Sequence, residues 1–186
     1  LQSDANDKAG VLTMAGGDST TVAAYNSQIT GSPQVNVDPN MANPLNYLDD
    51  YITDYDYNYT AGRYGSNATW GSASSPVIVV CDAGSGSVEF AGTIQGWGIL
   101  VVKGNLTLSG SFTFHGLVLV YQTGSIDDQV TTGGTPRVIG SIIMTGGDGS
   151  GFTMKGNSAV LYSWDALDKA QHIKKLQAYR ILSWYE

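Results

Sequence analysis

The sequence predicts a mainly β protein: a single-stranded parallel β-helix with triangular turns, one side of which is covered by a short helix. Three observations support this fold class. Glycine recurs at every sixth position in the middle of the chain, apolar residues alternate in phase with it, and some repeat units are apolar on both faces. A fixed short period in strand-forming sequence indicates one small structural unit stacked on itself.

The six regularly spaced glycines are expected to be the structural corners of the repeat. Six residues suffice for a short strand and a corner, and glycine takes a tight corner without steric cost. Three such units make one triangular turn of about 18 residues, which is close to the repeat length of other solenoids. The corner residues are Gly86, Gly92, Gly98, Gly104, Gly110 and Gly116.

The alternation within each unit separates inward from outward positions. The third and fifth residues of a unit share one face of a strand, and all of these are apolar except Gly96. Most outward positions are polar on two sides of the triangle, whereas on the third side they are Ile99, Val101, Leu117 and Leu119. A strand that is apolar on both faces is normally buried on both faces. We therefore expect these four residues to form an outer face that is covered.

Two predicted helices are candidates for this cover. The first spans residues 45–56, where apolar side chains recur at helical spacing after Asn43-Pro44. The second spans Asp165 to Gln177, which lacks glycine and proline and carries acids in its first turn and lysines in its last. Covering an apolar sheet with a helix is the usual layered solution.

The whole chain, residues 1–186, is expected to form one solenoid domain, because no low-complexity linker divides it. Strands of the core are expected to begin near residues 77, 99, 117, 141 and 159. Short N-terminal strands are expected at Val11 to Met14, Thr20 to Tyr25 and Gln34 to Val37, and a closing strand at Tyr179 to Tyr185. The four segments are 1–43, N-terminal strands or cap; 44–76, short helix and loop; 77–162, β-helix core; and 163–186, C-terminal helix and strand.

Composition restricts the partners and the location. The net charge is −7, and residues 1–160 contain only five basic side chains, which argues against nucleic acid as a partner because phosphate binding needs clustered cations. A charge-poor chain rich in glycine, serine, threonine and tyrosine is typical of an extracytoplasmic protein of the cell surface or periplasm. No stretch is long and apolar enough to span a membrane. Membrane attachment is therefore expected only through an N-terminal segment outside this sequence.

One short motif resembles a metal site. Asp54, Asp56 and Asn58 form the D-x-D-x-N opening of an EF-hand-like calcium loop. The sixth position holds Tyr59 where glycine is required, and the twelfth holds Gly65 where a bidentate glutamate belongs. These three residues are weak calcium candidates, and a solvated helix end is the preferred interpretation.

The remaining reactive side chains do not suggest catalysis. Neither His115 nor His172 has a partner at metal-ligand spacing, and Cys81, the single cysteine, is expected in the core or at a corner. No G-x-S-x-G nucleophile motif is present. We therefore predict no enzyme activity, no catalytic residues, no metal and no cofactor.

Several segments together resemble a known family. Trp70-Gly71, the strand at 77–80, GWGILVVKGNLTLSGSFTFHGLVLV at 96–120, the IIM strand near residue 143 and the final ILSWYE resemble PilX-type, type IV pilus-associated proteins of bacteria. The six-residue core is also similar to bactofilins, whose β-helices stack end to end. The resemblance to the pilus-associated group covers residues 65–186 and implies a right-handed helix. It also implies an exported structural protein without catalysis, with other pilus or surface proteins as partners.

The predicted function is therefore that of a non-catalytic structural or surface protein, a type IV pilus-associated assembly or adhesion component. One alternative is a carbohydrate-binding β-helix module with glycans as partners, suggested by Trp70, Trp97 and the tyrosines. A less favoured alternative is a hexapeptide-repeat acyltransferase. Such enzymes combine one large and one small inward residue per unit and need a histidine base, whereas Phe112 and Phe114 are both large and only His115 is placed to serve.

Overall fold

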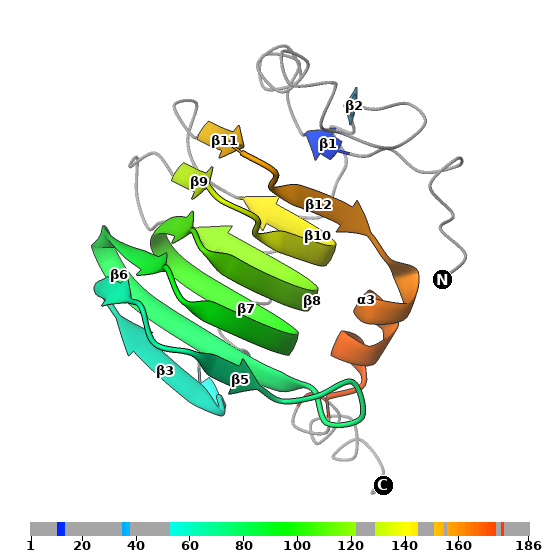
Figure 1. Cartoon of the computed structure of the whole chain (residues 1–186). Coiled ribbons are helices and arrows are strands. Elements are labelled where there is room, and N and C mark those ends of the chain that lie inside the picture. The colour runs from blue at the N-terminus through cyan, green and yellow to red at the C-terminus, as the bar shows by residue number, and fades with distance from the viewer. Residues whose placement is uncertain are drawn as a thin grey trace, which may run out of the picture.

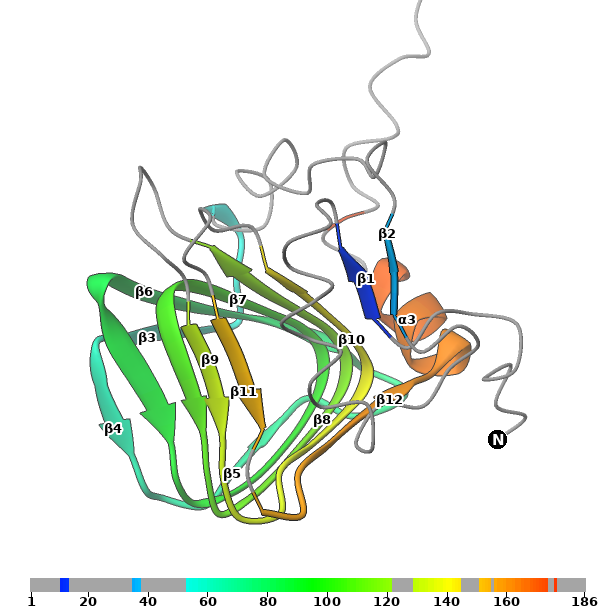
Figure 2. The same ribbon diagram turned by 90° about the horizontal axis from the view of Figure 1, so that it is seen from above.

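The computed structural model describes residues 11–13, 35–37, 53–121, 129–144, 151–154, 156–173 and 176. Within these ranges the chain is mainly β, with parallel strands stacked as a β-solenoid of about four turns and one short helix (Figure 1). Figure 2 looks down the stack from its C-terminal end. The chain runs counter-clockwise as it rises toward the viewer, so the solenoid is right-handed.

The strands bend around the corners of a triangle, so the longest of them contribute to more than one side. A separate parallel pair consists of β1 (Val11–Thr13) and β2 (Val35–Val37). The solenoid strands are β3 (Tyr57–Thr60), β4 (Gly62–Tyr64), β5 (Ala68–Trp70), β6 (Val77–Phe90), β7 (Thr93–Leu108), β8 (Ser111–Tyr121), β9 (Gln129–Thr132), β10 (Arg137–Met144), β11 (Gly151–Met154) and β12 (Ala159–Tyr162). All of their mutual pairings are parallel.

The strand register defines three sides, which we name here. The covered side contains residues 77–82 of β6, 98–103 of β7, 116–121 of β8 and 140–144 of β10. The Glu89 side contains residues 87–90 of β6 and 105–108 of β7, followed by β9 and β11. The Trp97 side contains β5, residues 93–97 of β7, 111–115 of β8 and 137–139 of β10, and β12.

The turns differ in length, and the pairing of β6 with β7 shifts register between Asp82 and Ser87. Gly98 pairs with Gly116, which is the expected turn of three six-residue units. Gly116 instead pairs with Gly140, so the next turn is longer than this regular one. Its extra residues lie between β8 and β9, because Tyr121 still pairs with Lys103. Turns of unequal length thus share the same corners.

The expected strand start near residue 159 was assigned to the wrong side. Ala159 pairs with Arg137 and so lies on the Trp97 side, rather than beside Ser141 on the covered side. The last turn is again longer than the regular one, which shifts β12 back by one side. The chain leaves the solenoid after Tyr162, at the point where a further strand of the covered side would begin.

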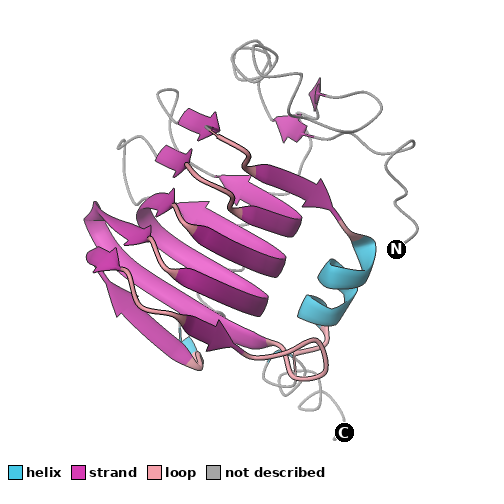
Figure 3. Ribbon diagram, viewed as in Figure 1, coloured by secondary structure: helices cyan, strands magenta, loops and turns pink. Residues whose placement is uncertain are grey.

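The chain instead forms α3 (Trp164–Gln171) at this point (Figure 3). Ser163 is the N-cap, and its hydroxyl oxygen accepts a hydrogen bond from the Ala166 backbone N–H at 3.3 Å. The predicted helix extended to Gln177, but α3 ends earlier, where the His172 N–H turns to the carbonyl oxygen of Lys169. The helix folds back over the covered side.

An outer hydrophobic cluster joins α3 to the covered side. Ile99, Val101 and Leu119 are buried there together with Ala170 and Ile173 of the helical segment, and Leu117 is half-buried beside them. These outward side chains are removed from water by the helix, which contributes about 1.5–3 kcal/mol for each large side chain that is fully buried. The covered side is therefore apolar on its inner and outer faces because both faces are packed.

The interior of the triangle is filled by the inward side chains of every turn. Phe90, Phe112 and Phe114 are fully buried and lie within ring-contact distance along the stack, together with Trp70. Gly96 breaks the apolar inward pattern because a β-carbon there would lie 2.6 Å from the Phe114 ring. The missing side chain makes room for the large rings.

Some sequence-based expectations fall outside the described residues. These are the Thr20 to Tyr25 strand, most of the helix at residues 45–56 and the closing strand at Tyr179 to Tyr185. The strands expected around Val11 and Val35 are present as β1 and β2. No helix in the described part of the chain is long and apolar enough to cross a membrane.

Candidate functional site

Each of the six predicted corner glycines lies where one side of the solenoid meets the next. The register places Gly86 beside Gly104 and Gly92 beside Gly110, while Gly98 pairs directly with Gly116. Gly98 and Gly116 have φ values of 127° and 136°, which side-chain-bearing residues rarely adopt. These glycines shape the scaffold and carry no side-chain chemistry.

The three weak calcium candidates do not form an EF-hand-like loop. The Asp56 carboxylate accepts a hydrogen bond from the Ile78 backbone N–H at 2.9 Å, and Asn58 lies within β3, where its amide donates to the Tyr55 hydroxyl at 3.4 Å. Asp54 lies in an exposed bend before this strand. The preferred helix-end interpretation was also wrong for Asn58, because the chain is extended from Tyr57 to Thr60 and pairs with β6. Among the residues that the structure describes, no three His, Cys, Asp or Glu side chains are grouped closely enough to hold a metal ion.

Trp70 and Cys81 are part of the interior and are inaccessible to a ligand. Trp70 is 1% exposed, and its indole N–H donates to the Tyr59 hydroxyl at 2.9 Å. Its burial removes Trp70 as a sugar-stacking residue, which was part of the case for a carbohydrate-binding module. Cys81 is also buried, and burial strongly raises the pKa of its thiol, which keeps the sulfur protonated.

The carboxylates near the Glu89 side are engaged in ion pairs. Glu89 lies 3.6 Å from the Arg63 guanidinium and accepts from the Ser109 hydroxyl at 3.2 Å. Asp82, at the end of a covered-side strand, lies 3.8 Å from the Lys103 ammonium. Such partly exposed pairs contribute little stability, about 0–1 kcal/mol each. They place the negative charge of this part of the solenoid away from the Trp97 side.

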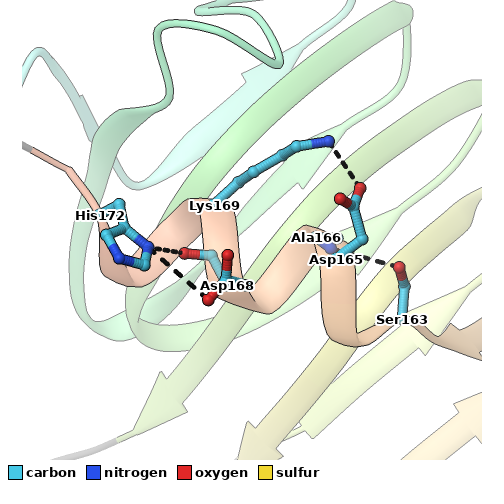
Figure 4. A network of polar contacts seen from close by, with 6 residues as sticks. All are labelled: Ser163, Asp165, Ala166, Asp168, Lys169 and His172. Carbon is cyan, nitrogen blue, oxygen red and sulfur yellow. Dashed lines mark hydrogen bonds and ion pairs between the residues drawn. The ribbon is translucent and has the colours of Figure 1, made fainter.

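The polar face of α3 is held by local contacts (Figure 4). The Lys169 ammonium lies 2.6 Å from the Asp165 carboxylate, one helical turn earlier. The Nδ1 atom of His172 lies 2.6 Å from the backbone carbonyl oxygen of Asp168 and 3.7 Å from the carboxylate of the same residue. These contacts lie within one helix and are those expected of a solvated helix face.

The Trp97 side presents two parallel rows of outward side chains. The register aligns Trp97 with His115, His115 with Ile139, and Ile139 with Leu161, and we call these four residues the apolar row. The polar row lies two residues earlier on the same strands and consists of Thr69, Gln95, Thr113 and Arg137. Sequence reasoning did not group these residues. The signal was available, because Trp97, His115 and Ile139 each precede a glycine of the repeat.

Trp97 and His115 stack on each other across neighbouring strands. Their ring centroids are 5.2 Å apart and their planes differ by 8°. Both side chains are half-buried. Burial lowers the pKa of His115 below its usual value, and the positive charge of Lys169 lowers it further. The imidazole is therefore held preferentially in its neutral form.

A shallow pocket lies where α3 meets the loop before β6. Its volume is about 350 Å³, and it is lined by Ala73, Ser74, Pro76, Asp168, Lys169 and His172. Pro76 precedes Val77, the register partner of Gly98, so this lining residue is next to the strand position that aligns with the end of the apolar row.

Comparisons with protein-family models, with curated proteins and with solved structures find no match for this chain.

Proposed function

We propose that this chain is a non-catalytic structural component of the bacterial cell exterior. In this proposal it works in type IV pilus assembly or adhesion, together with other pilus or surface proteins. The observation that carries the proposal is the continuous parallel stack, whose inward side chains are buried from Val79 through Val138. A stack of this kind is suited to hold surfaces at fixed spacing. The sequence resemblance described above supplies the pilus context.

The placement of reactive groups supports a role without catalysis. In the ranges that the structure describes, the Cys81 thiol is buried, Glu89 is paired with Arg63, and His115 stacks on an indole. A nucleophilic site needs a nucleophile, a base and an orienting group within hydrogen-bond reach of one another. The acyltransferase alternative loses support for the same reason. Its candidate base, His115, stacks on Trp97 and is near the positive charge of Lys169, and within the described ranges no carboxylate is hydrogen-bonded to it.

Deletion of the gene in the bacterium that encodes it tests this proposal. We expect fewer pili or weaker surface attachment, because an assembly or adhesion component is missing. Complementation with the wild-type gene should restore both properties. The Gly133→Ala variant should also restore them, because a β-carbon at Gly133 meets no atom within 4 Å. Unchanged pilus number, motility and attachment in the deletion strain would rule the proposal out.

A further inference from the structure

We propose that the Trp97 side binds an acidic glycan, a chain of sugars that carry carboxylate groups. The inference does not rest on the pilus role, because it concerns one face of the purified protein. The face is assembled from β5, β7, β8, β10 and β12, which lie side by side in the sheet (Figures 1 and 3). The adjacent covered side lies beneath α3, whereas Gln95 and Arg137 on this side are exposed to solvent.

The polar row supplies hydrogen-bond donors at regular spacing. Neighbouring strands of a sheet lie about 4.8 Å apart, so Gln95, Thr113 and Arg137 follow one another at that interval. The amide, hydroxyl and guanidinium groups are donors that suit carboxylate and hydroxyl acceptors. A polymer with repeated acceptors meets this row better than an isolated small molecule does, because several groups bind at once.

Charge indicates that the ligand is acidic. The whole chain has a net charge of −7, yet the described strands of the Trp97 side contain no aspartate or glutamate. Arg137 is exposed, and its guanidinium forms no ion pair with any residue that the structure describes. An unpaired guanidinium binds a carboxylate in a two-pronged geometry. The two carboxylates of α3 already have partners on the helix, because Asp165 pairs with Lys169 and Asp168 accepts from the Gln171 amide at 2.7 Å.

The apolar row suits the less polar surface of a sugar ring. Leu161 is 40% exposed and Ile139 is half-buried beside it, which leaves apolar area on a face that is otherwise polar. The stack of Trp97 on His115 covers one face of each ring. The indole N–H of Trp97 donates to no group within the described ranges and is a further donor for an acidic sugar.

Other polyanions fit these observations less well. Nucleic acid binding relies on clustered cations that neutralise several phosphates, and Arg137 is the one cation in the described strands of this side that is charged regardless of pH. A glycan needs fewer charges, because hydroxyl groups and apolar C–H surfaces provide much of its contact. Single-stranded DNA is therefore the appropriate competing polyanion in the test.

Isothermal titration calorimetry of the full chain with an oligogalacturonate tests the inference. We expect wild-type binding that weakens about ten-fold in Arg137→Gln, because a charge-assisted hydrogen bond is lost. The matched control is Arg63→Gln, which removes the same charge from an exposed arginine paired with Glu89. This variant should bind as the wild type does. A fully methyl-esterified oligogalacturonate, which lacks the carboxylate charge, should bind at least about ten-fold more weakly than the acid.

A second variant separates a defined site from general charge attraction. Thr113→Val removes a hydroxyl donor from the polar row, keeps the net charge and retains a residue that favours strands. We expect weaker binding in this variant, with the far-ultraviolet circular dichroism of the wild type. Absence of wild-type binding would overturn the inference. Equal weakening by Arg63→Gln, or equally tight binding of single-stranded DNA, would overturn it as well. None of these binding results changes the pilus number or attachment expected for the deletion strain. The proposed pilus role and the proposed glycan site can therefore be disproved independently.

Discussion

Gly116 lies so close to Gly98 that no side chain fits between them. A β-carbon on Gly116 would overlap the carbonyl oxygen of Gly98, and Gly140 stands in the same relation to Gly116 one turn later. Gly116 also has a φ of 136°, in the region that favours glycine. One corner of the solenoid is therefore a ladder of glycines from successive turns whose backbones are in contact.

Gly116→Ala is expected to destabilise the fold by about 2–4 kcal/mol, because it adds both backbone strain and a clash with the turn below. The measurement is the urea-unfolding midpoint followed by circular dichroism. Gly133→Ala is the matched control, since a β-carbon there has no neighbour within 4 Å. Equal midpoints for the two variants would show that this corner has no such contact.

Ile173→Ala is expected to loosen α3 from the covered side. The side chain is 3% exposed and packs in the cluster that contains Ile99 and Val101. Its truncation should cost about 2–5 kcal/mol of unfolding free energy, the range for deletion of a buried isoleucine side chain. The exposed neighbour Gln171 provides the control, because Gln171→Ala should change stability by no more than about 0.5 kcal/mol. A small, equal effect of both substitutions would mean that the helix does not hold this side.

Stability should depend on pH through His115. Its pKa in the folded protein lies below the usual 6.5, because burial and then the charge of Lys169 disfavour the imidazolium. The unfolded chain therefore binds more protons than the folded protein at acidic pH. The contribution of His115 to the free energy of unfolding is fully present above pH 6.5 and is lost as pH falls through the lower folded pKa. The thermal unfolding midpoint should fall between about pH 7.5 and pH 5, and it should fall less in His115→Gln than in the wild type. An identical loss in both proteins would exclude this role of His115.

Cys81 should resist thiol reagents in the native protein. It is buried, and burial raises the pKa of its thiol, so both access and thiolate formation are suppressed. Reaction with 5,5′-dithiobis(2-nitrobenzoic acid), followed by absorbance, should be slow under native conditions and rapid in denaturing urea. Rapid modification of the native protein would contradict the placement of this strand in the core.

The regular part of the fold was predictable because each local signal agreed with the others. The corner glycines and the inward residues share one six-residue phase, and the third side was apolar on both faces. The side assigned to β12 could not be predicted in this way. Residues added to a turn leave the alternation within the next strand unchanged. The sequence pattern that begins at Ala159 is therefore compatible with any of the three sides.

The arrangement of the Trp97 side was harder to foresee than the core. Trp97 and His115 are a full turn apart in the sequence, and they meet only because two turns are in register. Trp70 lies before the regular repeat, so the six-residue pattern could not show whether its side chain is inward or outward. Asp54, Asp56 and Asn58 matched part of a calcium motif, but pairing of β3 with β6 places Asn58 in a strand and engages Asp56 with Ile78.

Immunogold labelling of intact cells tests the proposed exterior role most directly. Antibodies raised against the purified chain would be applied to wild-type and deletion strains without permeabilisation. We expect gold particles on the wild-type surface, concentrated at pili or at their bases, and none on the deletion strain. Particles that appear only after the cells are permeabilised would contradict a function outside the cell.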